Sequence, residues 1–150
     1  MIYLLRHGEA EDGNGKPDAD RELTEKGKRQ AEEAGGALAA LGERIDACLS
    51  SPKVRSAETA RIACRHLGLE VELTEGLRGG PFDSSELAAG RGNVLLVGHE
   101  PDFSEEVARL TGANVKLRKG GIAAVDGALL HLLMRPRDLR RIGREVPPAT

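Results

Sequence analysis

The chain has 150 residues, of which 39% are hydrophobic and 31% are charged, a composition typical of an ordinary globular domain. This length suits a single domain with one hydrophobic core, which we expect to span residues 1–150. The net charge is −2, and one Tyr and two Phe are the only aromatic residues. We therefore expect binding neither to nucleic acid nor to an acidic membrane surface.

The amino-acid sequence also predicts a cytoplasmic location. No apolar run approaches the length of a membrane span, and the chain opens without the charged start of a signal peptide. Cys48 and Cys64 are far apart and form no C-x-x-C pair. Because Cys48 falls in a predicted strand and Cys64 in a predicted helix, we expect two buried thiols.

The first predicted element is a strand over residues 2–6, whose apolar run is typical of a strand covered on both faces. Residues 11–22 are polar and predict a flexible loop. Thr24 is the expected N-cap of a helix that ends at Gly42. Apolar residues at helical spacing predict its buried face: Ala31, Ala34, Leu38 and Leu41.

A second strand is predicted over residues 45–50. Ser51-Pro52 then predicts a helix start, with a capping hydroxyl followed by proline in the first turn. This helix is expected to end at Gly68 and to bury a row of apolar side chains: Val54, Ala57, Ala60, Ala63 and Leu67. Residues 70–73 predict a third strand.

An irregular connection follows over residues 74–92, with a short helix expected at 85–89. Residues 93–98 form the clearest buried strand in the sequence. Pro101 and Asp102 predict the start of another helix, with one apolar face: Phe103, Val107 and Leu110.

Two strands are predicted near the end of the chain, at 122–125 and 129–134, joined by a tight turn at Asp126-Gly127. The remainder, residues 135–150, predicts a short basic helix and a Pro-Pro tail. Strands that alternate with helices indicate an α/β fold, a three-layer sandwich with a mostly parallel central sheet and helices on both faces.

Three predicted strand ends carry residues suited to binding and transferring phosphate. Arg6 and His7 end the first strand, Arg55 lies in the first turn after the second, and His99 ends the 93–98 strand. Because the ends of parallel strands meet at one edge of a sheet, these side chains are expected to converge beside a helix N-terminus, itself an anion-binding arrangement. Arginine forks hold phosphoryl oxygens, and a neutral imidazole can attack phosphorus. Considered on its own, each of these residues also suits a purely structural role. His7 and His99 would then be strand-end histidines, and Arg55 would be a solvated helix residue.

The motifs at these positions resemble the histidine phosphatase superfamily, the phosphoglycerate mutase-like fold, in four places and in the family's order across nearly the whole chain. The short connection after the third strand makes the chain most similar to the small SixA-type phosphohistidine phosphatases. The matching motifs are Leu5-Arg6-His7-Gly8-Glu9, Leu23-Thr24-x-x-Gly27, Ser50-Ser51-Pro52-x-x-Arg55-Ser56-x-x-Thr59-Ala60 and Val97-Gly98-His99.

The resemblance implies roles for the matched residues. His7 would be the nucleophile that forms a phosphohistidine intermediate, Arg6 and Arg55 would bind the phosphoryl oxygens, and His99 would complete the pocket. It implies a phosphate-like anion in the site and no metal or cofactor. The two arginines also disfavour the imidazolium form of His7, which keeps the ring available as a nucleophile.

The remaining site residues rest on weaker signals. Gly8, Glu9 and Arg21 are expected to contact the substrate, although a surface role for Arg21 is also open. The resemblance implies a proton donor in the connection after the third strand, where Glu75 lies without a matching pattern around it. Glu9 is the other candidate donor, because it is two residues from the nucleophile.

The sequence thus predicts a metal-independent phosphatase that acts through His7. A protonated phosphoimidazole leaves as neutral imidazole and needs little help from an acid, so phosphohistidine on a protein is the expected substrate. The alternatives are a phosphatase for small phosphate esters and a non-catalytic module that binds phosphate or phosphoprotein.

Two other segments are interpreted as structural. Lys119-Gly120-Gly121 is interpreted as a turn. The arginines of the last segment are interpreted as part of a solvated helix; they are Arg135, Arg137, Arg140, Arg141 and Arg144.

Overall fold

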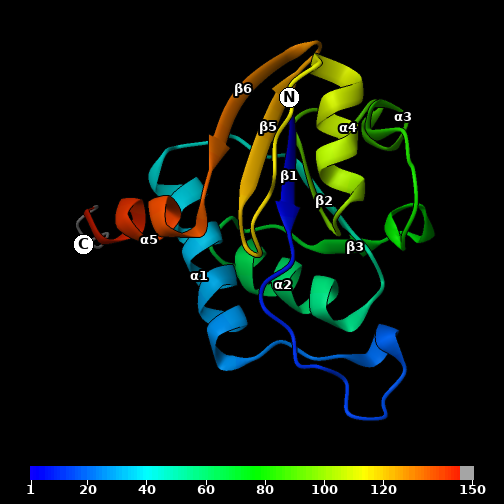
Figure 1. Cartoon of the computed structure of the whole chain (residues 1–150). Helices are drawn as coiled ribbons and strands as arrows, with labels where there is room; N and C mark the ends of the chain where they lie inside the picture. Colours follow the sequence, from blue (N-terminus) through cyan, green and yellow to red (C-terminus); the bar gives the residue numbers. More distant parts are fainter. Residues whose placement is uncertain (146–150) are drawn as a thin grey trace.

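The computed structural model describes residues 1–145 and contains one six-stranded sheet with the strand order β3-β2-β4-β1-β5-β6 (Figure 1). The strands are β1 (Ile2–Arg6), β2 (Ala47–Ser50), β3 (Val71–Leu73), β4 (Val94–Gly98), β5 (Ile122–Asp126) and β6 (Leu129–Met134). The four strands β3, β2, β4 and β1 are parallel to one another. β5 runs antiparallel to β1, and β6 antiparallel to β5.

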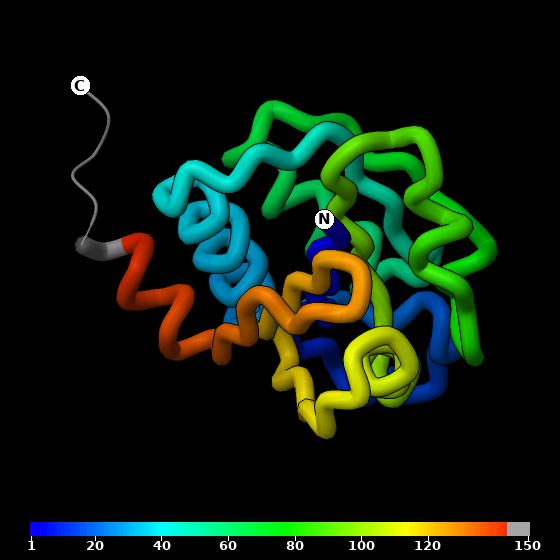
Figure 2. The backbone as a smooth tube through the Cα atoms, turned by 90° about the horizontal axis from the view of Figure 1, so that it is seen from above, coloured from blue at the N-terminus to red at the C-terminus, as the bar shows by residue number. Residues whose placement is uncertain are grey.

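Helices cover both faces of this sheet, as Figure 2 shows from above. The helices are α1 (Glu25–Ala40), α2 (Val54–Arg65), α3 (Ser84–Ala88), α4 (Asp102–Thr111) and α5 (Pro136–Glu145). On one face, small residues such as Ala34 of α1 and Ala60 of α2 pack against Tyr3 and Leu95 of the sheet. On the other face, Phe103 and Val107 of α4 pack against Leu4 and Leu96. These two apolar layers confirm the predicted three-layer α/β sandwich.

The start predicted for the second helix is wrong. α2 begins at Val54 after the N-cap Lys53, three residues beyond Ser51. The backbone N–H of Ser51 donates to the carbonyl of Val97 at 2.9 Å, so Ser51 still continues the pairing of β2 with β4. Its hydroxyl accepts from the backbone N–H of Lys53 at 3.2 Å and holds the turn before the helix.

Smaller differences occur elsewhere. The second strand begins at Ala47 rather than at residue 45, and the loop over residues 11–22 contains a short 3-10 helix, η1 (Asp18–Asp20). The hairpin turn is formed by Gly127 and Ala128, one residue later than predicted. The predicted N-cap is confirmed, because the hydroxyl of Thr24 accepts from the N–H of Gly27.

The basic C-terminal helix is confirmed as α5, and it packs against α1 through Leu139, which is fully buried. The predicted Pro-Pro tail lies outside the described residues.

Within residues 1–145, no helix is both long enough and apolar enough to cross a membrane. Cys48 and Cys64 are both buried free thiols, as expected.

Candidate active site

The central strands β2, β4 and β1 lie side by side and deliver their C-terminal ends to one edge of the sheet, below β1 in Figure 1. Arg6 pairs with Gly98 in register, so the residues that follow, His7 and His99, leave adjacent strands at the same level. A hollow of about 400 Å³ opens at this edge. The four predicted catalytic residues are among those that line it, which are Arg6, His7, Arg21, Lys53, Arg55, Gly79, Gly80, His99, Glu100, Pro101, Asp102 and Lys119.

His7 is held in one orientation by its own loop. Its ring is 7% exposed, and Nδ1 lies 2.7 Å from the carbonyl oxygen of Gly8. Because a carbonyl only accepts, Nδ1 must carry a proton. In the neutral ring Nε2 therefore holds the lone pair, as a nucleophile requires.

The surroundings of His7 favour that neutral form. Burial, together with the nearby charges of Arg55, Arg6 and Lys119, lowers the pKa of His7 to about 4, against the opposing hydrogen bond to Gly8. The ring is thus uncharged at neutral pH.

His99 is the second buried imidazole, and its ring centroid lies 5.2 Å from that of His7. Nε2 of His99 lies 2.8 Å from Oγ of Ser51, which joins the ends of β4 and β2. Burial lowers the pKa of His99 to about 3, with further contributions from His7, Arg55 and Lys53. Nδ1 of His99 is buried and has no hydrogen-bond partner within residues 1–145.

The two arginines are anchored through part of each guanidinium. Arg6 donates from Nη1 to the carbonyl of Leu117 at 3.0 Å, and Arg55 donates from Nη1 and Nη2 to Asp18. In the described part of the chain, Nε of each arginine is buried without a partner. Buried polar atoms without partners are rare in folded proteins and often mark functional sites.

Two glycines allow the His7 loop to touch the first turn of α1. A Cβ on Gly8 would lie 2.5 Å from the carbonyl oxygen of Gly27, and a Cβ on Gly27 would lie 2.0 Å from that of Glu9. Neither position has room for a larger residue. Gly8, one of the predicted contact residues, also donates its N–H to Oγ1 of Thr59 on α2 at 3.1 Å. The loop after β1 is thus fixed between α1 and α2.

The loop over residues 11–22 supplies a carboxylate that the sequence did not single out. Asp18 accepts from Arg55 at its backbone oxygen (2.8 Å) and its side chain (3.1 Å), and from Nη1 of Arg21 at 3.1 Å. Lys53 lies 3.4 Å from the same carboxylate. Hydrogen bonds from Arg21 and Arg55 hold the pKa of Asp18 below its usual range. Arg21 lines the hollow, as the predicted substrate contact requires.

Replacement of Asp18 by alanine should lower kcat/KM by about 10- to 100-fold, because Arg55 loses the partner that orients its guanidinium. Asp20 lies in the same short helix and makes no side-chain hydrogen bond within the described residues, so Asp20→Ala is the matched control. Steady-state kinetics on both variants measures the difference. Equal kinetics for the two would contradict a positioning role for Asp18.

The buried histidines should also make stability depend on pH. Unfolded histidine titrates near about pH 6.5, whereas His7 and His99 in the folded chain titrate near about 4 and about 3. Between these limits the unfolded state binds more protons, so the free energy of unfolding should fall as the pH falls from about 6.5 to about 4.

Each proton difference contributes up to about 1.4 kcal/mol per pH unit. His7→Asn removes one of the two groups and should make the slope shallower by up to that amount. Urea unfolding of the wild type and the variant across this pH window measures the slopes. Identical slopes would mean that the His7 pKa is not lowered in the folded protein.

The two predicted proton donors lie away from the hollow. Glu9 is not among its lining residues; its carboxylate accepts from the hydroxyl of Thr24 at 3.0 Å and lies 3.8 Å from Nζ of Lys26. Glu75 points to solvent, with 77% of its side chain exposed, and pairs with Arg78 at 3.6 Å. Neither residue is placed to protonate a leaving group at His7.

Two other carboxylates do line the hollow. Glu100 follows His99, and its side chain accepts from the backbone N–H and the hydroxyl of Ser104. Asp102 accepts from the N–H of Gly80 at 3.1 Å, and burial, with the nearby charge of Glu100, raises its pKa. Their nearness in sequence to the His99 motif was the available signal, whereas the local pattern at Asp102 predicted only a helix start.

Lys119 and Lys53 also line the hollow, and neither was predicted as a site residue. The turn predicted at Lys119-Gly120-Gly121 exists, because the N–H of Gly120 donates to the carbonyls of Arg6 and His7. The same turn brings Lys119 to the wall of the hollow. Lys53 reaches the hollow from the N-cap of α2.

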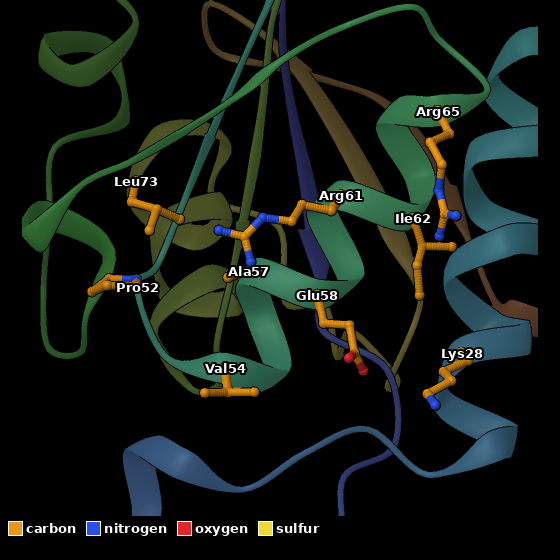
Figure 3. Close-up of a pocket in the computed structure, with 9 residues that line it drawn as sticks. All are labelled: Lys28, Pro52, Val54, Ala57, Glu58, Arg61, Ile62, Arg65 and Leu73. Atoms are coloured by element: carbon orange, nitrogen blue, oxygen red, sulfur yellow. The ribbon is translucent and has the colours of Figure 1, made fainter.

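A separate hollow of about 580 Å³ lies beside α2 (Figure 3). Its lining combines apolar and cationic side chains from α1, α2 and the segment around β3: Lys28, Pro52, Val54, Ala57, Glu58, Arg61, Ile62, Arg65 and Leu73. None of the four predicted catalytic residues lies there.

No group of three or more His, Cys, Asp or Glu side chains within the described residues is arranged to hold a metal ion.

Known proteins share this sequence pattern. Residues 2–88 match the model of the histidine phosphatase superfamily, branch 1. An uncharacterised protein of Picosynechococcus sp. (strain PCC 7002) is 36% identical over 135 residues, which cover 81% of each chain. The mitochondrial serine/threonine-protein phosphatase Pgam5 of Drosophila ananassae is 41% identical over 71 residues, which are 47% of this chain and 24% of Pgam5.

Solved structures share the fold. A protein of Agrobacterium tumefaciens, assigned as the phosphohistidine phosphatase SixA, is 26% identical, with a TM-score of 0.77 over 90% of this chain and 97% of that one. The protein histidine phosphatase SixA, in complex with tungstate, is 24% identical, with a TM-score of 0.79 over 92% and 98% of the two chains. The chain therefore belongs to branch 1 of the histidine phosphatase superfamily, and it is a SixA-like phosphatase.

Proposed function

We propose that the protein hydrolyses phosphohistidine on a protein substrate without a metal, through a phosphoryl group held covalently on His7. One observation carries this proposal. Two buried imidazoles and two arginines line one hollow, and three of these four side chains contain a buried nitrogen without a hydrogen-bond partner in the described part of the chain. An anion with several oxygens supplies the acceptors that such nitrogens need.

In the first step, Nε2 of His7 attacks phosphorus with its lone pair. The Nε2–P bond forms as the bond from phosphorus to the leaving imidazole breaks, and the imidazole keeps that electron pair. Arg6 and Arg55 donate to the phosphoryl oxygens as charge moves among them, and His99 lies beside the transferring group. In the second step, water attacks phosphorus, the Nε2–P bond breaks, and inorganic phosphate and free His7 remain.

Asp102 is the carboxyl that we assign to the leaving group. Its raised pKa favours the protonated form more than that of an ordinary aspartate, and it lines the same hollow as His7. A protonated phosphoimidazole leaves as neutral imidazole and needs little help from an acid, whereas an alkoxide leaving group needs a proton in the transition state. One weak acid therefore suits phosphohistidine better than an alkyl phosphate ester.

Access to the hollow also supports a protein substrate. The long connection between β3 and β4 contributes only Gly79 and Gly80 to its walls, so small residues border the entrance on that side. The likeness to SixA proteins points to the same substrate class, and the tungstate held by one of them agrees with a phosphate-like anion in this hollow.

A substrate panel tests the proposal. We expect kcat/KM for a histidine-phosphorylated protein to exceed that for p-nitrophenyl phosphate and sugar phosphates by a factor on the order of 100. A preference for the small esters would instead identify a small-molecule phosphatase. Binding of phosphate without turnover of any substrate would identify the non-catalytic module.

A further inference from the structure

A second hollow lies next to the active-site hollow and is strongly basic. It measures about 740 Å³, and we call it the basic groove. It shares Arg6 and Lys119 with the active site. Seven of its ten lining residues are cationic and one is a carboxylate: Arg6, Glu9, Lys26, Gln30, Lys116, Arg118, Lys119, Arg135, Pro136 and Arg137.

Most of this positive charge is not neutralised by the protein itself. Arg135 is paired with Asp138 at 2.9 Å, and Lys26 lies 3.8 Å from Glu9. The other exposed cations of the groove have no carboxylate within 4 Å among the side chains of residues 1–143; they are Lys116, Arg118, Lys119 and Arg137. The whole chain carries a net charge of −2, so this local excess is a property of the groove and not of the composition.

The cations come from three separate parts of the chain that meet beside the site. Lys26 lies in the first turn of α1, Lys116 to Lys119 precede β5, and Arg135 and Arg137 lie where β6 leads into α5 (Figure 1). Apart from Arg6, these cationic side chains are exposed. Exposed, spaced cations match a series of carboxylates along a polypeptide, whereas a compact polyanion is better held by buried, converging donors.

We infer that the basic groove docks an acidic segment of the phosphoprotein substrate, adjacent to the phosphorylated side chain that enters the active site. The inference rests on the proposed function for the identity of that substrate. Because Arg6 and Lys119 line both the groove and the active-site hollow, a segment bound in the groove borders the site of the reacting phosphoryl group. Exposed charge pairs of this kind act mainly on the rate of association and weaken as salt is added.

Charge reversal tests the inference, with the double variant Lys116→Glu/Arg137→Glu. Both residues line the basic groove and neither lines the active-site hollow. The matched control is Arg61→Glu/Arg65→Glu, which makes the same charge change on the exposed side of α2 (Figure 3). The first probe is an unphosphorylated, fluorescently labelled peptide rich in Glu and Asp, with its binding followed by anisotropy over a range of salt concentrations.

The groove variant should bind this peptide about tenfold more weakly than the wild type, because two exposed charge contacts become repulsive. The control should bind it as the wild type does. In turnover, the groove variant should lose a similar factor in kcat/KM for an acidic histidine-phosphorylated protein. It should hydrolyse free phosphohistidine within about twofold of the wild-type rate, which also shows that it has folded.

Three results would overturn the inference: no peptide binding by the wild type, equal losses in both double variants, or tripolyphosphate binding to the groove more tightly than the peptide. The last result would mean that the groove takes a small polyanion. Peptide binding lost in the groove variant, in a protein that hydrolyses no phosphohistidine, would support the docking groove and contradict only the proposed substrate.

Discussion

Replacing His7 with asparagine should abolish turnover, with kcat reduced by a factor on the order of 10⁴ or more. Asparagine has no lone pair of comparable basicity at the position of Nε2, so no covalent intermediate can form. The side chain is 7% exposed, and asparagine keeps a donor that can reach the carbonyl of Gly8. The variant should therefore fold and still bind phosphate.

Rapid acid-free quenching after mixing with a ³²P-labelled phosphohistidine protein measures the intermediate directly. Wild-type protein should carry acid-labile, base-stable label, and His7→Asn should carry none. His131→Asn is the control, since His131 is exposed on β6, away from the hollow. Label that persists on His7→Asn would show that another residue accepts the phosphoryl group.

Replacing Arg55 with alanine should lower kcat/KM by about 10²- to 10³-fold, the usual cost of removing one donor that stabilises charge in the transition state. Arg55→Lys keeps the charge but loses the planar fork, so it should recover only part of the activity. Inhibition by tungstate gives a second measurement, and its affinity should fall in the same order as activity.

The control for Arg55 is Arg91→Ala, which removes an exposed arginine that pairs with Glu72, outside the hollow. It should leave kinetics and tungstate inhibition unchanged. Full recovery of activity in Arg55→Lys would contradict bidentate binding and would mean that charge alone is needed at this position.

Much of the site could be predicted because it is attached to the most regular part of the fold. The apolar runs that end at Arg6 and Gly98 are strands buried on both faces, and parallel pairing alone brings their ends together. The residue that follows each strand is therefore placed by the sheet. His7 and His99 were predictable in this way.

The contacts made by loops were not predictable from patterns of this kind. Asp18 reaches Arg55 from a polar loop 37 residues away in sequence, and nothing in the local sequence specifies that distance. Lys119 enters the site because its turn is hydrogen-bonded to the carbonyls after β1. Glu75 was expected from its place after the third strand, but a short 3-10 helix, η2 (Glu75–Leu77), leaves it exposed beside Arg78.

The closure of the loop over residues 11–22 has a consequence for engineering this enzyme. Ala10 and Leu23 form an antiparallel bridge, and the N–H of Glu11 donates to the carbonyl of Glu22 at 2.9 Å, so the two ends of the loop meet outside the sheet. These contacts are made by the backbone at the two ends of the loop and do not involve the residues between them. We expect loops of another sequence that keep an aspartate at position 18 to alter selectivity while the nucleophile stays where β1 places it.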